Sequence, residues 1–569
     1  MEGHKFKGGK KLLQLCMGQN YYDSNVVYRE YVQNACDSLY AAQRMGLIKN
    51  LQNSEVISVE INRYAREVVI LDRGTGVPFD KIGNTLVDIG ASTKNGYDDI
   101  GNYGIGRLVG ANWCDRIIFE TSYVNENIKS ILTFDAESAR KFIESDIDYE
   151  IGEIVDSVTH LVTENENETE HYFRVRLINA KDELLDYDKV YEYLAVTAPV
   201  PYQYIFDEMM LEGLDIYPDF KALLDAEKVC VISLKQGDSS KEIEKPYTSK
   251  IDIAGTQADI TVPTFFELTD HDFGQLAWGW YSLKTPAEQM NSVPFRGIRL
   301  RKHNMAVGNE ETLATYFPKP VDANYFIGEV FITHRNIIPA GSRNGLCQST
   351  EKKVFDNLLK NKFKELKKTY DTLSRLGSAA LKPYIDSEIA FKQSKLTLVS
   401  EPNSVMAKQI KTQSQLEIKK CKNELAKKLK DISHNAEVGP LIDQTVKYWQ
   451  KEADKRISDK NASKKPEEKI DPINIRGMVN KVIDELGENQ PSNVVAINQT
   501  PSQTNPLTIS PISNVQEPKE TDVYRRLGKT EWQIMKKVYN VLNSDKKLDP
   551  TSLERIKKKL KKKLLDDNE

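Results

Sequence analysis

One predicted helix near the start of the chain constrains the fold most, because it carries polar side chains beside an apolar stripe. The segment YREYVQNACDSLY, residues 28 to 40, lies within a predicted helix from about residue 25 to 45. At 100° per residue, Glu30, Asn34 and Asp37 fall within about 60° of one another at the rim of that stripe. A solvated helix face would explain this pattern if the segment stood alone. The segments that follow it favour a helix that forms the floor of a polar pocket.

A strand-end carboxylate beside two glycines comes next. VVILDRGTGVP ends an apolar strand with Asp72, Gly74 and Gly76. A carboxylate held at that point can accept a hydrogen bond, and the glycines leave room for a flat ring. The pattern D-x-G-x-G is nevertheless only a turn in most proteins.

Two further segments have the composition of phosphate-binding loops. The first, IGASTKNG, contains Ser92, Thr93 and Lys94. The second, GNYGIG, consists of Gly101, Asn102, Tyr103, Gly104, Ile105 and Gly106, and an apolar helix is predicted after it. Glycines let backbone amides approach phosphates closely, and a helix N-terminus adds partial positive charge. A lone G-x-x-G-x-G is a weak signal, and the βαβ context of a dinucleotide-binding unit is missing.

Taken in order, the four segments resemble the GHKL nucleotide-binding fold and, within it, the heat-shock protein 90 chaperones, including bacterial HtpG. REYVQNACDSLYAAQR and IGNYGIGRLVGA look most like that branch. The resemblance implies an α+β protein with an N-terminal Bergerat-type α/β sandwich, a chaperone-like α+β middle domain and a helical C-terminal region. It also implies ATP hydrolysis, with ATP and Mg²⁺ as cofactors, coupled to a conformational change.

The resemblance implies a role for each residue of these segments. Glu30 would orient and deprotonate the attacking water, Asn34 would bind the magnesium ion, and Asp37 would support the helix. Asp72 would accept a hydrogen bond from the adenine amine, and Gly76 would leave space beside the base. The lid at residues 92–94 and the loop at residues 101–106 would contact the phosphates, Lys94 directly. Magnesium prefers a few hard oxygen ligands, which agrees with this assignment.

A second α+β block, from about residue 195 to 375, resembles the middle domain of the same chaperones. Its segments VPFRGIRLRKHNMAVG, YFIGEVFIT and NIIPAGSRNGLCQS carry the likeness, and Ser342 and Arg343 occupy the place of a pair that reaches the γ-phosphate. A guanidinium suits that task because it stays charged and matches phosphate geometry. An ordinary surface arginine is the alternative for Arg343. Arg299 and Arg301 could face the nucleotide or a client, but a solvated strand face is the favoured reading.

The chain departs from the chaperone pattern in several places. The lid between Gly76 and Gly106 is short, and no threonine is recognisable beside the adenine, Thr169 being only a weak candidate. Beyond about residue 390 nothing resembles the dimerisation domain of those chaperones, so a homodimer is expected by analogy only.

The composition of the 569-residue chain, with 40% hydrophobic and 28% charged residues, is that of an ordinary water-soluble protein. We expect an ATP-binding domain at 1–190, a middle domain at 191–380, a helical region at 381–488, a flexible linker at 489–521 and a small basic helical domain at 522–569. The net charge of −4 indicates no particular partner. The six cysteines show no paired spacing, and no apolar run is long enough to span a bilayer. We therefore expect a cytoplasmic protein that does not contact membranes.

Two classes of function remain open. The first is an ATP-driven switch of the HtpG chaperone type, which acts on client or partner proteins. The second is a DNA-associated clamp like MutL or MORC in a bacterial defence or repair system. The segment GASTKN resembles the MutL lid, but Arg343 stands where MutL has a lysine. The basic C-terminal segment KKKLKKKLL could bind nucleic acid or an acidic partner, although such a run is usually a solvated face. The absence of interleaved aromatic residues weighs against single-strand binding.

Overall fold

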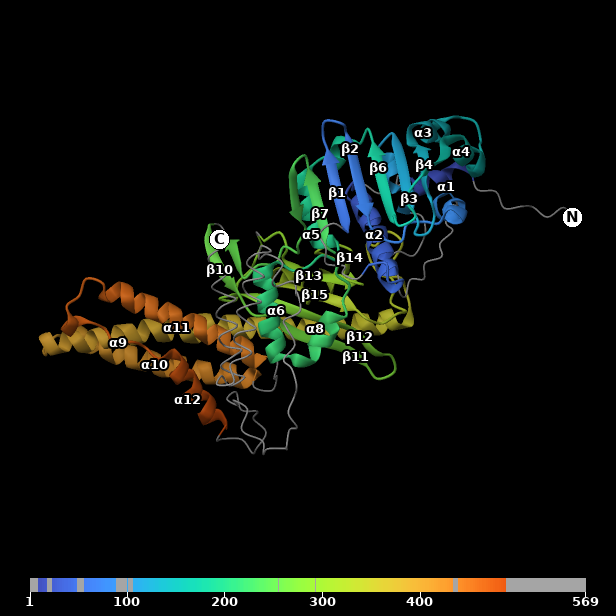
Figure 1. The fold of residues 1–569 in the computed structure, drawn as a ribbon. Coiled ribbons are helices and arrows are strands. Elements are labelled where there is room, and N and C mark those ends of the chain that lie inside the picture. The colour runs from blue at the N-terminus through green and yellow to red at the C-terminus, as the bar shows by residue number, and fades with distance from the viewer. Residues whose placement is uncertain are drawn as a thin grey trace, which may run out of the picture. The chain divides into compact units, whose positions relative to one another are not determined.

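Two β-sheets and a set of long helices make up the described part of the chain (Figure 1). The computed structural model describes residues 9–17, 23–48, 56–87, 100, 106–253, 255–291, 293–432 and 438–487. This mixed architecture, with sheets first and helices last, confirms the α+β class expected from the sequence. No helix in these ranges is both long and apolar enough to cross a membrane.

The first sheet is eight-stranded, with the order β5-β4-β3-β6-β2-β1-β7-β8. Its strands are β1 (Ile57–Asn62), β2 (Glu67–Asp72), β3 (Arg116–Ser122), β4 (Ile128–Asp135), β5 (Thr159–Asn165), β6 (Tyr172–Ile178), β7 (Ile232–Gln236) and β8 (Ser239–Glu242). All pairs are antiparallel except β1 with β7. The sequence pattern placed residues 229–235 in the second block, but β7 and β8 belong to this sheet. Because β7 pairs with β1 in parallel, a long connection must separate the two strands in the sequence, and their pairing leaves no local signal.

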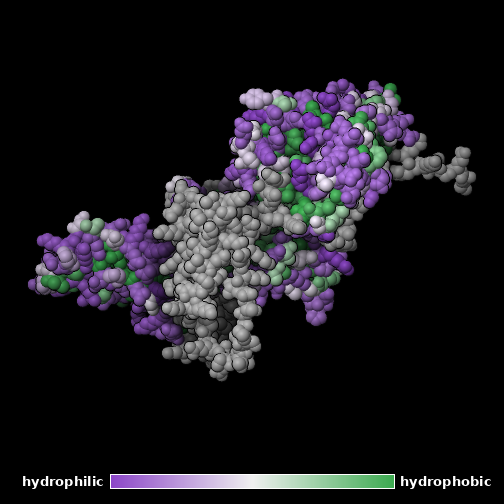
Figure 2. Space-filling model, viewed as in Figure 1, coloured by the Kyte–Doolittle hydropathy of each residue, from purple (hydrophilic) through white to green (hydrophobic). Residues whose placement is uncertain are grey.

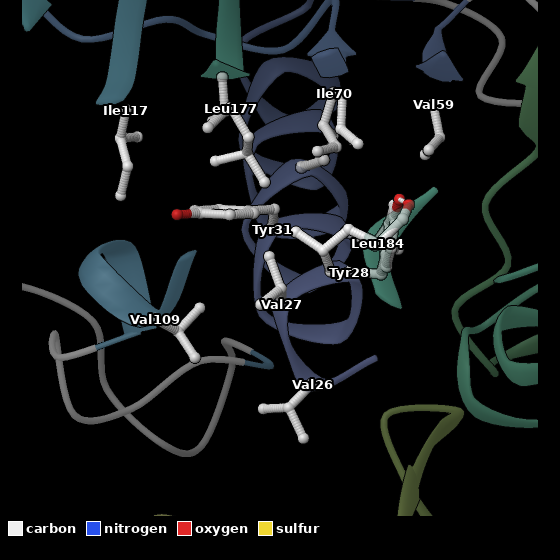
Figure 3. Packing of buried hydrophobic residues seen from close by; sticks show 14 of the residues in the cluster. Val26, Val27, Tyr28, Tyr31, Val59, Ile70, Val109, Ile117, Leu177 and Leu184 are labelled. Atoms are coloured by element: carbon white, nitrogen blue, oxygen red, sulfur yellow. Dashed lines mark hydrogen bonds between the residues drawn. The ribbon is translucent and has the colours of Figure 1, made fainter. Parts of the chain in front are cut away.

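Helices cover one face of this sheet. They are α1 (Lys10–Cys16), α2 (Val26–Arg44), α3 (Ala136–Glu144), α4 (Ile151–Val158) and α5 (Tyr187–Thr197). In Figure 3, Val27 and Tyr31 of α2 point towards Ile70, Ile117 and Leu177 on three adjacent strands. The opposite face carries cross-strand ion pairs such as Arg174–Glu120, with a nitrogen–oxygen distance of 2.6 Å. This alternation of apolar and charged positions is what a sheet covered on one face requires.

The second sheet has seven strands and a core rich in aromatic residues. Its strands are β9 (Lys250–Ile253), β10 (Thr256–Ile260), β11 (Thr264–Asp270), β12 (Gly274–Thr285), β13 (Gly297–Lys302), β14 (Met305–Val307) and β15 (Phe326–Ile332). Helices α6 (Tyr204–Ile216) and α7 (Lys221–Asp225) precede it in the chain. Met305 of β14 belongs to the apolar core of the first sheet, so the two blocks share part of their packing.

Five α-helices follow the second sheet in the described part of the chain. They are α8 (Thr350–Arg375), α9 (Lys382–Ser400), α10 (Val405–Ile432), α11 (Gly439–Asn461) and α12 (Ile475–Gly487). Ser349 caps α8, since its hydroxyl accepts a hydrogen bond from the amide of Lys352 at 3.1 Å. The surface of α9 to α12 is mostly hydrophilic in the view of Figure 2. These helices confirm the helical character expected after residue 380, up to residue 487.

Candidate functional site

The polar trio lies on α2 where this helix leaves the apolar core. Asp37 is 5% exposed, the Glu30 side chain is 13% exposed, and Asn34 is half-buried. The alternative reading of the trio as a solvated helix face is therefore wrong. Asp37 contacts Ile100 and Glu30 contacts Gly106, and these two described residues flank the glycine loop in the sequence.

Two groups from different parts of the chain contact the two oxygens of Glu30. Arg29 pairs with Oε1 through its Nη2, at 2.9 Å. Gly106 lies against the other oxygen, and a Cβ built on it would approach Oε2 to 2.5 Å. The last glycine of the loop is thus required by close packing against the carboxylate. The sequence analysis did not identify Arg29 as a site residue. Its position next to Glu30 in the sequence is the feature that could have indicated this role.

Asp37 holds the backbone at the start of the glycine loop. Its Oδ1 accepts a hydrogen bond from the amide of Ile100 at 2.7 Å. The carbonyl of Ile100 accepts a second hydrogen bond, from Nη2 of Arg343 at 2.5 Å. One peptide therefore links α2 to a loop that lies more than 240 residues further along the chain.

Arg343 is a buried residue, only 5% exposed, which rules out the alternative of an ordinary surface arginine. Its backbone is left-handed, with φ of 55°, and its Nη1 has no hydrogen-bond partner among the described residues. Burial lowers the pKa of Arg343 to about 10, against the opposing effect of Glu30. The neighbouring carbonyl of Ser342 accepts from Arg29 Nη2 at 3.2 Å. A charged guanidinium with an unsatisfied donor thus faces the α2 carboxylates.

Asp72 ends β2 and organises the glycine turn that follows. It is 3% exposed, and its Oδ1 accepts from the amide of Gly74 at 2.9 Å. A Cβ on Gly74 would approach the Ser38 hydroxyl of α2 to 2.0 Å, and that hydroxyl accepts from the amide of Thr75 at 3.0 Å. Ser38, which the sequence reading overlooked, therefore ties this turn to the helix that carries the trio.

Gly76 adopts a left-handed conformation, with φ of 67°, because its backbone packs against the end of β3. A Cβ there would lie 1.9 Å from the carbonyl oxygen of Ser122. Beside it, the Thr121 hydroxyl accepts from the amide of Val77 at 2.8 Å and donates to the Tyr172 carbonyl at 3.0 Å. The observed reason for Gly76 is thus contact with protein backbone. Thr169, the weak candidate for the adenine threonine, is an exposed turn residue.

Several predicted site residues lie outside the described residues. They are Ser92, Thr93, Lys94, Gly101, Asn102, Tyr103, Gly104 and Ile105, together with the linker and the basic C-terminal segment. Of the glycine loop, Gly106 is described, and the predicted apolar helix after it is a short 3₁₀ helix, Gly106–Asn112. A helix of that length does not support the macrodipole argument made from the sequence.

Arg299 and Arg301 are buried, so the favoured reading of a solvated strand face was wrong. Arg299 is 6% and Arg301 0% exposed. Arg301 pairs with Glu329, whose second oxygen is 2.8 Å from Nζ of Lys245. Burial alone would raise the pKa of Glu329, but the two cations hold it below its usual value. The partners of Arg301 and Lys245 in these ion pairs thus lie inside the second block.

The comparison with protein families agrees with this geometry. Residues 22–169 match the family model described as histidine kinase-, DNA gyrase B- and HSP90-like ATPase. The match supports membership of the GHKL superfamily. It covers α2, β2, the glycine turn and Gly106, which are the elements that converge around the trio. A search of the curated proteins finds no match to the chain.

The residues gathered around the trio fit a magnesium-bound nucleoside triphosphate. No group of three or more His, Cys, Asp or Glu side chains forms a metal cage in the described ranges. A magnesium ion that is carried by phosphates needs only one or two protein oxygens, and the side chain of Asn34 can supply one. The buried and unsatisfied Nη1 of Arg343 is suited to a phosphate oxygen.

Proposed function

We propose that this protein is an ATP-hydrolysing conformational switch in which Arg343 couples the two blocks. The observation that carries the proposal is the position of Arg343. It lies on a loop after the second sheet, yet it is buried against Ile100 and faces Glu30 of the first block. A guanidinium at that point would sense a triphosphate and stabilise the charge that develops on it.

Each residue has a separate task in the proposed reaction. Bound magnesium, held by Asn34 and the phosphates, would neutralise charge on the triphosphate. Glu30 would orient the water and take its proton, while Arg29 keeps the carboxylate in place. Asp37 would hold Ile100, and with it the entry to the glycine loop. Asp72 would accept a hydrogen bond from the exocyclic amine of adenine.

The arginine assignment is tested by an Arg343→Ala variant. We expect ATP hydrolysis to fall about 10²- to 10³-fold, as when one donor to the transition state is removed, while ATP binding weakens far less. Arg335→Ala, an exposed arginine from the same block, is the matched control. Single-turnover hydrolysis and calorimetric titration separate the two effects. Unchanged turnover in Arg343→Ala would remove this residue from the mechanism.

The proposed contact of Asp72 with adenine is tested by an Asp72→Asn variant. An amide presents an NH₂ group as well as an oxygen and loses the charge, so we expect ATP affinity to fall at least about tenfold. Because Asn can still accept from the Gly74 amide, the turn should remain folded, which circular dichroism can check. ATP affinity equal to that of the unmodified protein would contradict the role given to Asp72.

The partner class is proposed in two forms. Our preferred form is an HtpG-like chaperone that acts on client or partner proteins as a homodimer in the cytoplasm. The second is a DNA clamp, and one observation on α10 favours it. Lys408, Lys411, Lys419 and Lys422 lie within about 80° on one face of this helix, at 100° per residue. None of the four forms an ion pair with another described residue.

The two forms make opposite predictions for ATPase stimulation. We expect an unfolded protein, and not duplex DNA, to accelerate hydrolysis. The DNA form predicts stimulation by duplex that falls steeply with salt and is lost when Lys419 and Lys422 are replaced by Glu. Replacing Lys420, which pairs with Glu417 at 3.2 Å, is the control on the same helix.

A further inference from the structure

Three side chains from neighbouring strands form a row at the end of the first sheet. Asp72 of β2 pairs in register with Phe173 of β6, and Phe173 pairs in register with Thr121 of β3. Residues in register on antiparallel strands have their Cβ atoms about 5 Å apart on the same face. The three side chains are therefore neighbours although they lie far apart in the sequence.

This row faces the side of the sheet that α2 covers. Side chains alternate along a strand, so Asp72 shares a face with Ile70, and Phe173 shares one with Leu177. Figure 3 shows Ile70 and Leu177 pointing towards α2. The row thus continues this face to the strand ends, where the turn after Asp72 lies against Ser38 of α2.

Within the row, Phe173 is the most accessible member. Asp72 is 3% and Thr121 1% exposed, whereas Phe173 is half-buried and its ring stacks on Phe119 with centroids 5.9 Å apart. The single hydroxyl proton of Thr121 is donated to the Tyr172 carbonyl, so it is not available to a ligand. The polar group and the ring surface that a base would meet here come from Asp72 and Phe173.

We propose that Phe173 is the base-contacting residue of the nucleotide site, an inference that rests on the proposed function. Asp72 would recognise the exocyclic amine, and Phe173 would supply affinity by packing against the flat ring. An aromatic contact with a base tolerates different ring substituents, since every base has a π-face. Base identity would then depend on Asp72, and base affinity on Phe173.

The test is calorimetric titration of the full chain with ATP, ITP and inorganic tripolyphosphate. ITP carries a carbonyl where ATP has the amine, so the unmodified protein should prefer ATP. Phe173→Ala should weaken ATP and ITP by a similar factor of about ten and leave tripolyphosphate unchanged. Phe173→Tyr, which keeps the ring, should restore both affinities. Phe142→Ala, a half-buried phenylalanine of α3 that packs on Tyr149, is the matched control.

The outcomes separate this inference from the proposed function. ATP binding that is unaffected in Phe173→Ala would overturn the inference and leave the proposed function standing. An equal loss for all three ligands would show a structural role and would also overturn it. An unmodified protein that binds no ATP would overturn the proposed function and the inference together.

Discussion

A Glu30→Gln variant is expected to bind ATP with nearly unchanged affinity and to hydrolyse it about 10²- to 10⁴-fold more slowly, because a general base is lost. The amide keeps the shape of the side chain, and its oxygen can still accept from Arg29, as Oε1 of Glu30 does at 2.9 Å. Gly106 also retains its packing contact. Single-turnover hydrolysis with radiolabelled ATP measures the effect.

The control for this variant is Glu60→Gln, which removes an exposed carboxylate from β1. It should hydrolyse ATP at the unmodified rate. Turnover in Glu30→Gln that stays within a few-fold of the unmodified protein would exclude Glu30 as the base. It would leave Asp37, the other acidic member of the trio, to be tested.

The second large effect is expected on stability, from Glu329→Gln. Glu329 is 0% exposed and lies between the cations of Arg301 and Lys245. The hydroxyl of Tyr202 also donates to it, at 2.5 Å. Removing the carboxylate charge takes away the ion-pair partner of two buried cations, which costs about 3–5 kcal/mol in free energy of unfolding.

Urea unfolding followed by tryptophan fluorescence measures this loss, because Trp280 lies in the same cluster and donates to Tyr202 at 3.0 Å. Glu164→Gln is the matched control. Glu164 pairs with Lys129 at 2.8 Å but is 57% exposed, and exposed pairs contribute about 0–1 kcal/mol. If the two variants lose the same stability, the buried network does not have the role given to it.

The buried residues around Glu329 also connect the second sheet to the chain segments near the end of α5 and before β7. Nη2 of Arg301 donates to the Val196 carbonyl at the end of α5, at 3.0 Å. The side-chain amide of Asn304 donates to the Lys228 carbonyl at 2.7 Å, shortly before β7. Arg301, which the sequence analysis placed on a solvated strand face, therefore stabilises the junction of the two blocks.

Strands with alternating or β-branched patterns were predictable from the sequence, and so was the site helix. The strand predicted to end at Asp72 is β2. The segments EVISVEINR, RIIFETSY, SILTFDA and YFRVRLI, whose alternating or β-branched patterns also predict strands, overlap β1, β3, β4 and β6. β12 went unpredicted because it is buried on both faces over most of its length and shows no alternation. β5 went unpredicted for the opposite reason, since it is an exposed edge strand with little apolar signal.

Local spacing along the chain was sufficient to place Glu30, Asn34 and Asp37 on one side of a helix and Asp72 at a strand end, because those relations depend on residues a few positions apart. The tertiary structure alone decided that Phe173 and Thr121 stand beside Asp72 and that Arg343 is buried against Ile100. Strand register and the pairing of buried charges join residues tens to hundreds of positions apart, and no local pattern records those contacts.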